Sequence, residues 1–144
     1  MSNRLRFTLP LLVTILLVAP LLAACGGGSS GPAAVDVTLT TYGISLSTAT
    51  VKAGSVTFNV KNDATDLVHE FVVVKTDLPA DQLTLDAEGN VAEDSLTVVD
   101  EIEDIEIGGG GELTVDLEAG HYVLICNVAD HYKGGMHADL TVTP

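Results

Sequence analysis

The sequence predicts an all-β domain, a sandwich or barrel of about eight short strands. From residue 35 onwards, apolar side chains alternate with polar ones in several segments, and turns rich in Gly, Asp and Asn separate these segments. Alternation with a period of two is typical of antiparallel strands that bury one face. Little of the chain has helical spacing, and short strands at such intervals indicate a sandwich or a barrel.

The first half of the domain contains four predicted strands, and the fourth carries a histidine. The strands are residues 35–41, 44–51, 56–60 and 68–75. In the fourth strand His69, Phe71 and Val73 have the same parity, so we expect all three to point into the core. An inward histidine is more often a hydrogen-bonded structural residue than a ligand, so His69 needs a second observation before it is assigned to a site.

Residues 76–111 are acidic and irregular, and they include no Lys or Arg. We expect a short helix over residues 78–83 and irregular edge strands between residues 96 and 107. The acidic side chains form either a solvated face or a docking patch. They lack the spacing of oxygen ligands and glycine that a calcium-binding loop requires.

Three further strands complete the domain, and the second of them ends at a cysteine. These strands are residues 113–117, 122–126 and 137–143. The parity of Tyr122 and Leu124 places the sulfur of Cys126 on the buried side. Four residues separate Cys126 from His131, and four more separate His131 from Met136. A thiol, an imidazole and a thioether therefore share one short loop.

The donors of this loop suit copper. Thiolate and thioether sulfur favour Cu(I), imidazole suits both oxidation states, and two His, one Cys and a weak axial Met form the ligand set of electron-transfer copper sites. The loop supplies only His131, so the second imidazole must come from elsewhere, and His69 is the best placed. His137 is an alternative to Met136, although neighbouring strand residues point to opposite faces.

The N-terminal residues have the layout of an export signal. Two arginines precede an apolar run, residues 7–22, which is shorter than a bilayer span and contains two prolines. The ending Leu22-Ala23-Ala24-Cys25 resembles a bacterial lipobox, which implies that Cys25 becomes the lipidated first residue. An ordinary signal peptide with an incidental cysteine is the alternative. The predicted organisation is a signal peptide at residues 1–24, a lipidated Cys25 with a Gly/Ser-rich tether at residues 25–34, and one domain at residues 35–144.

An unpaired cysteine in an exported protein calls for an explanation. The chain has two cysteines, and if Cys25 carries lipid, Cys126 has no partner. A bound metal explains an isolated Cys126. The rival is a disulfide between Cys25 and Cys126, which would tie a flexible tail to a core strand.

The chain is strongly acidic. Its formal net charge is −14, and cleavage after residue 24 would leave four basic and twenty acidic residues, a charge of −16. Such a surface argues against binding to nucleic acid and against electrostatic attachment to anionic lipid. It favours a basic protein partner.

With these motifs in place, the sequence resembles the cupredoxin, or blue copper, family. The pattern is an early strand histidine followed by Tyr122-x-Leu124-x-Cys126-x4-His131-x4-Met136. The two four-residue gaps are similar to those of auracyanin and rusticyanin. The resemblance implies a cupredoxin-like Greek-key β-sandwich with one copper at one end. It also implies that Cys126 binds copper as a thiolate, that His69 and His131 complete a trigonal plane, and that Met136 is the axial ligand.

Two neighbours of these residues depart from the family pattern. Glu70 stands where many members have Asn, and Asn127 stands where Ser or Thr is common; in relatives both positions help to stiffen the site. The resemblance also implies that His131 reaches the surface as the exit for the electron. Its expected surroundings there are a weakly charged patch of Ala129, Tyr132, Gly134 and Gly135.

The predicted function is a lipid-anchored single-electron carrier outside the cytoplasm, without enzymatic activity. We expect a monomer on the outer face of the cytoplasmic membrane or in the periplasm, where it meets redox proteins such as a basic cytochrome. The alternative is copper storage or delivery. Delivery usually relies on exposed, exchangeable Met and His, and this sequence has no Met-rich or His-rich tail. A multicopper enzyme needs further centres that two spare histidines cannot build, and a structural sandwich with an incidental metal site remains open.

Overall fold

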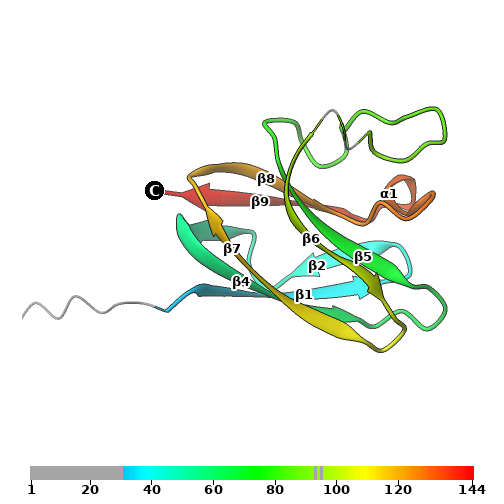
Figure 1. Ribbon diagram of the computed structural model, residues 1–144, viewed down its shortest axis with the longest axis horizontal. Helices are drawn as coiled ribbons and strands as arrows, with labels where there is room; N and C mark the ends of the chain where they lie inside the picture. Colours follow the sequence, from blue (N-terminus) through cyan, green and yellow to red (C-terminus); the bar gives the residue numbers. More distant parts are fainter. Residues whose placement is uncertain (1–30, 93, 95) are drawn as a thin grey trace, which may run out of the picture.

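The computed structural model describes residues 31–92, 94 and 96–144, and it confirms the predicted β-sandwich (Figure 1). One sheet has the strand order β2-β1-β4-β7, and the other has the order β3-β9-β8-β5-β6. The elements are β1 (Ala33–Thr40), β2 (Gly43–Leu46), β3 (Thr50–Lys52), β4 (Gly54–Asn62), β5 (His69–Lys75), β6 (Thr97–Ile105), β7 (Gly110–Leu117), β8 (Gly120–Ile125), α1 (His131–Gly134) and β9 (His137–Thr143).

The expected strand at residues 44–51 is in fact two strands in different sheets. β2 pairs with β1, and its end is marked by Ser47, which donates a backbone hydrogen bond to Asp36 and accepts one on its hydroxyl oxygen, both 2.9 Å long. β3 then pairs in parallel with β9 of the other sheet. A short polar bend at residues 47–49 therefore switches the chain between layers, which alternation along the sequence does not reveal.

The main core lies between the two sheets and is built from the alternating residues of both. Its centre includes Phe58 of β4 and Phe71 of β5, whose ring centroids are 5.3 Å apart. Burial of a large apolar side chain stabilises a fold by roughly 1.5–3 kcal/mol. The fully or nearly fully buried members include Val35, Val37, Leu39, Val56, Phe58, Val60, Phe71, Val73, Leu117, Tyr122, Leu124, Leu140 and Val142. His69 shares the inward parity of Phe71 and is fully buried, as predicted.

A second apolar cluster covers the outer face of β5 and β8, so both strands are buried on both faces. The strand residues in it are Val72, Val74, Val123 and Ile125, and the segment between β5 and β6 packs over them. Continuous apolar runs such as those of β5 and β8 are typical of doubly buried strands. The sequence-based assignment placed only one face of these strands in a core.

The expected helix over residues 78–83 is wrong, because this stretch is a turn and loop. Its backbone is held by side chains of other elements. The Tyr132 hydroxyl donates to the Ala80 carbonyl at 2.6 Å and accepts from the Leu83 N–H at 3.0 Å, while Asp139 accepts from the Ala80 N–H at 2.9 Å. These bonds satisfy backbone groups that a helix would otherwise satisfy internally. Within the described residues, the one α-helix is α1.

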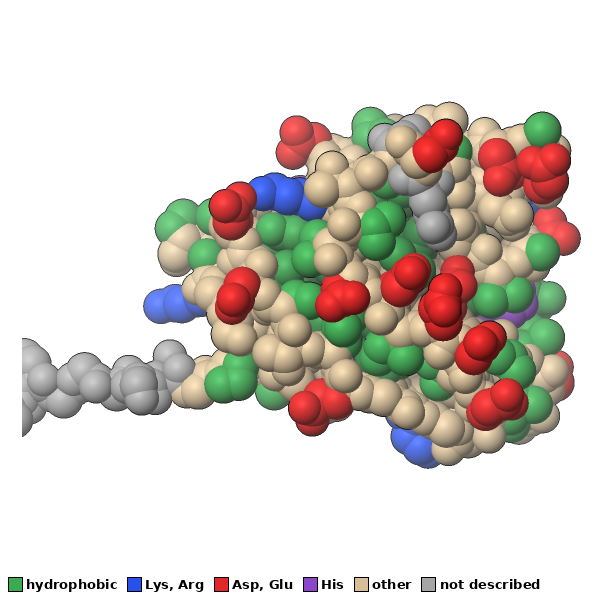
Figure 2. Space-filling model, in the orientation of Figure 1, with side chains coloured by type: hydrophobic (Ala, Val, Ile, Leu, Met, Phe, Trp, Pro, Cys, Tyr) green, Lys and Arg blue, Asp and Glu red, His purple; other side chains and the backbone are tan. Residues whose placement is uncertain are grey.

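Of the five acidic residues between positions 96 and 111, all but Glu106 lie on β6, an edge strand as expected. β6 pairs with β5 through two register irregularities, and its Asp100, Glu101, Glu103 and Asp104 are exposed. Figure 2 shows acidic side chains spread over this face of the molecule and few basic ones. An edge that carries charge discourages pairing with other strands.

The structure places the start of the domain two residues earlier than expected. Ala33 and Ala34, assigned to the tether, pair with Val56 and Thr57 of β4. The predicted signal peptide, Cys25 and most of the tether lie outside the described residues. In the described part of the chain, no helix has the length and apolar character that crossing a membrane requires.

Candidate metal centre

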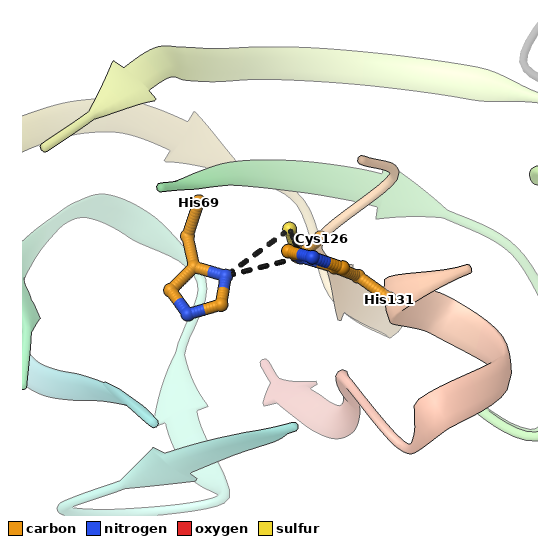
Figure 3. A group of neighbouring side chains, drawn as sticks. All are labelled: His69, Cys126 and His131. Carbon is orange, nitrogen blue, oxygen red and sulfur yellow. Dashed lines mark hydrogen bonds between the residues drawn. The ribbon is translucent and has the colours of Figure 1, made fainter. Parts of the chain in front are cut away.

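Three side chains from separate segments meet at one end of the sandwich (Figure 3). His69 is the first residue of β5, Cys126 follows β8 directly, and His131 opens α1. Cys126 Sγ lies 3.3 Å from His131 Nδ1 and 3.8 Å from His69 Nδ1, and the two Nδ1 atoms are 3.2 Å apart. Among the described residues, this is the one group of three or more His, Cys, Asp or Glu donors close enough to hold a metal.

The pairing of β5 with β8 brings His69 and Cys126 together. In this antiparallel pair Val72 lies opposite Ile125, so the start of β5 meets the end of β8. The backbone N–H of Glu70 points at Cys126 Sγ at 3.4 Å. Because both strands are packed on both faces, the sulfur and the first imidazole are held by the most buried part of the fold.

The loop after Cys126 is closed by backbone hydrogen bonds. Met136 N–H donates to the His131 carbonyl, and Cys126 N–H donates to the Met136 carbonyl, each at 3.1 Å. Asp130 precedes α1 with φ of 65°, and Gly135 follows it with φ of 115°, a conformation that favours glycine. Met136 is fully buried and clusters with the other three side chains. The two four-residue gaps thus accommodate one helical turn and return Met136 to the site.

Burial shifts the pKa values of the three donor side chains. It is the main cause that lowers the pKa of both His69 and His131, and the neighbouring His131 lowers the pKa of His69 further. Both imidazoles are therefore neutral at neutral pH, which ligation requires. Burial also raises the pKa of the Cys126 thiol, partly offset by the N–H of Glu70. Metal binding must therefore release the proton of this thiol.

The donor chemistry fits copper. His69 Nδ1 faces the cluster, whereas its Nε2 is buried and makes no hydrogen bond with any described residue. The atoms that converge are two imidazole nitrogens and one thiol sulfur. Nitrogen and sulfur donors of this kind suit copper.

The two residues that depart from the family pattern contact each other. Glu70 Oε1 accepts a 2.6 Å hydrogen bond from the backbone N–H of Asn127. The Asn127 side chain bonds both backbone groups of Val91, accepting at 2.6 Å and donating at 3.0 Å. Together they tie the start of β5 and the loop before β6 to the residue after Cys126, so they stiffen the site in a different way from the expected Asn and Ser or Thr.

Two expectations for the surroundings of His131 are wrong. His131 is only 5% exposed, and Tyr132 points into the second apolar cluster and does not line a surface patch. The ring of Tyr42 covers His131 instead, with centroids 5.8 Å apart and an interplanar angle of 86°. Sequence reasoning missed Tyr42 because no local pattern links a turn near the start of the domain to the ligand loop.

The two other histidines of the domain lie outside the cluster. His121 bonds the Thr76 carbonyl at 2.8 Å and the Asp139 carboxylate at 3.0 Å. His137, considered as an alternative ligand to Met136, packs its ring against Tyr132 at 5.1 Å between centroids. The structure therefore groups Met136, and not His137, with the metal donors.

The family model of the sulfocyanin (SoxE) domain matches residues 27–144. The chain belongs to this family. Sulfocyanin domains are of the cupredoxin type, so the resemblance found in the sequence is confirmed. His69, Cys126, His131 and Met136 cluster as a type 1 copper site. Among curated protein sequences, none matches this chain.

Solved structures show the same fold at low sequence identity. The chain is similar to auracyanin from Roseiflexus castenholzii, with 23% identity and a TM-score of 0.57 over 79% of this chain and 100% of that one. Auracyanin A, a blue copper protein from Chloroflexus aurantiacus, has 21% identity and a TM-score of 0.57 over 78% and 100%. Rusticyanin from Thiobacillus ferrooxidans has 16% identity and a TM-score of 0.62 over 79% of each chain. At these identities the likeness concerns the fold alone.

Proposed function

We propose that this protein is a single-electron carrier that uses one type 1 copper ion. The observation that carries the proposal is the buried triangle of His69 Nδ1, Cys126 Sγ and His131 Nδ1, with sides of 3.2–3.8 Å. Copper supplies the one-electron chemistry by alternating between Cu(I) and Cu(II). The chain supplies the donors, their rigid placement and the exclusion of water.

Each of the four residues has a separate task. Cys126 would give up its proton and hold the copper as a thiolate, while His69 and His131 would hold it through Nδ1 as neutral imidazoles. Met136 would supply a weakly bound thioether that tunes the reduction potential. The four side chains are between 0% and 5% exposed, so solvent has little access to the donors.

Rigidity supports electron transfer because a ligand that moves between oxidation states adds to the barrier. Cys126 and His69 sit on two strands that are packed on both faces. His131 and Met136 are linked by a backbone hydrogen bond of 3.1 Å within the same loop. The Glu70 and Asn127 contacts add a second layer of support. Such a scaffold keeps similar donor positions in both oxidation states.

The closed site argues against an enzyme and against copper delivery. Substrate chemistry at a metal needs an open coordination position, and the full set of two imidazoles, a thiolate and a thioether leaves none. Delivery needs donors that exchange readily with a partner, whereas these side chains are buried. We therefore propose that the protein transfers electrons without transforming a substrate.

The setting of the protein is proposed from its termini and charge. Export and lipidation at Cys25 would place the domain on the outer face of the membrane, at the end of a Gly/Ser-rich tether. A mature charge of −16 favours a basic redox partner such as a cytochrome, since complementary charge speeds association. We propose that the domain acts there as a monomer.

Repeated redox cycling of the copper-loaded protein tests the proposal. An electron carrier keeps its copper through many cycles of a mild reductant and oxidant while a Cu(I) chelator is present, and each cycle restores the full visible absorption. Rapid loss of copper to the chelator in the reduced state would instead identify a copper-handling protein. A complex that holds only Cu(I) and never regains colour would also contradict electron carriage.

A further inference from the structure

Tyr42, in the turn between β1 and β2, covers His131 from the outside. The two rings meet edge to face, with centroids 5.8 Å apart and planes at 86°. Tyr42 is 52% exposed, whereas His131 is 5% exposed. A molecule that approaches His131 from this side therefore meets the tyrosine ring first.

The position of Tyr42 depends on the two glycines of the ligand loop. A Cβ atom at Gly134 would collide with the Tyr42 ring, and one at Gly135 would lie 3.2 Å from the Tyr42 carbonyl oxygen. The turn that carries Tyr42 is also tied to the loop before β5, since the Thr41 hydroxyl donates to Asp66 at 3.3 Å. The Tyr42 ring thus packs on Gly134, and the hydrogen bond from Thr41 to Asp66 holds the turn that carries the ring.

We propose that Tyr42 is a positioning residue that shields His131 from solvent and from small reagents. Small redox reagents then exchange electrons with the copper across the Tyr42 ring and not by direct contact with the imidazole. An aromatic cover also keeps water from the edge of His131 and restrains the ring, because edge-to-face pairs have a preferred geometry. The shielding itself concerns the polypeptide alone, and only its effect on electron exchange rests on the proposed function.

Chemical modification of the metal-free protein tests the shield without copper. Diethyl pyrocarbonate reacts with neutral imidazole, and peptide mass spectrometry reports the rate at each histidine. In Tyr42→Ala we expect His131 to react at least about tenfold faster than in the parent protein, equal to ~1.4 kcal/mol of activation free energy. Tyr42→Phe, which keeps the ring, should leave the rate unchanged.

The other histidines and a matched variant provide the controls. The rate at His131 is taken relative to His121 and His137, so differences in reagent activity cancel, and the rate at the fully buried His69 reports any general loosening of the fold. Leu78→Ala removes an exposed apolar side chain that follows the far end of β5, and it should not alter the ratio. A ratio in Tyr42→Ala equal to that of the parent protein would overturn the proposal.

Electron exchange of the copper-loaded protein with hexaammineruthenium gives the second test. Removal of the ring lets this small complex approach His131 more closely, so Tyr42→Ala should react at least about tenfold faster, or ~1.4 kcal/mol. An equal or slower rate of electron exchange in Tyr42→Ala would overturn the proposal that Tyr42 shields His131.

The two tests together distinguish the failure of the shield from the failure of the proposed function. If modification reveals the shield but the parent protein exchanges no electrons, the proposed function fails and the shield stands. If electrons are exchanged but modification is unchanged, the shield alone fails.

Discussion

Replacing Glu70 by Gln removes one negative charge beside Cys126 with little change in shape. Glu70 Oε1 accepts a 2.6 Å hydrogen bond from the Asn127 N–H, and a Gln oxygen can accept the same bond. Burial raises the pKa of the Cys126 thiol, and the Glu70 carboxylate adds to this effect. The carboxylate is therefore close enough to act on the charge of the site.

The expected change in reduction potential follows from Coulomb's law. Two unit charges roughly 6–8 Å apart interact by about 2–3 kcal/mol at an effective dielectric constant of about 20. A negative charge favours Cu(II), so its removal favours Cu(I). Because a tenfold change in a one-electron equilibrium is about 59 mV, the Glu70→Gln variant should have a reduction potential higher by about 0.1 V.

Protein-film voltammetry of the copper-loaded variants measures this shift. Asp116→Asn is the matched control, since it removes the same charge from an exposed position at the far end of β7. Exposed charges beyond a Debye length of about 8–10 Å are largely screened, so this control should stay near the parent potential. A Glu70→Gln potential equal to the Asp116→Asn value, or below that of the parent, would refute the electrostatic reasoning.

Four further changes test other parts of the account. Cys126→Ser should abolish intense visible colour on addition of Cu(II) while circular dichroism retains the β signal. Met136→Leu should keep the colour and raise the potential, because loss of a weak axial donor disfavours Cu(II). Tyr132→Phe should lower the unfolding free energy in urea by about 1–3 kcal/mol, because it leaves two buried backbone groups without their partner. The pKa of both site histidines is lowered from 6.5, so in the metal-free protein their NMR signals should titrate at a lower pH than those of a free imidazole. Their share of stability is fully present above pH 6.5 and is lost as the pH falls from there through their folded pKa values.

Each of these predictions has a clear failure. Strong colour in Cys126→Ser would show that the Cys126 sulfur does not bind the copper. A lower potential in Met136→Leu would show that Met136 is not the axial ligand. An unchanged urea midpoint for Tyr132→Phe would show that the segment over β5 does not depend on its hydroxyl. Titration of both rings at or above the pH at which a free imidazole titrates would contradict the effect of burial.

Local periodicity was sufficient for the parts of the fold that position the strongest ligands. The parity of His69 with Phe71 placed it in the core, and the parity of Cys126 with Leu124 did the same for the sulfur. Ligand spacing then identified His131 and Met136, because a short loop closed by two four-residue gaps has few ways to arrange its donors. These inferences depend only on neighbours along the chain.

Long-range contacts were not accessible in this way. The continuous run Val72-Val73-Val74 is compatible with a strand buried on one face or on both, and only the packing of the segment before β6 decides this. The helix α1 has four residues, and it depends on the left-handed Asp130 and Gly135 at its ends and not on periodicity. The contact of Tyr42 with His131 joins distant parts of the sequence and leaves no local signal.

Titration of the metal-free protein with Cu(II), followed by visible absorption and electron paramagnetic resonance, tests the central claim most directly. The account predicts that an intense thiolate-to-copper charge-transfer band grows to saturation at one copper per chain and is bleached reversibly by a mild reductant. A copper complex without that band, or a band that persists in Cys126→Ser, would contradict a type 1 site built on this triangle of two imidazoles and one sulfur.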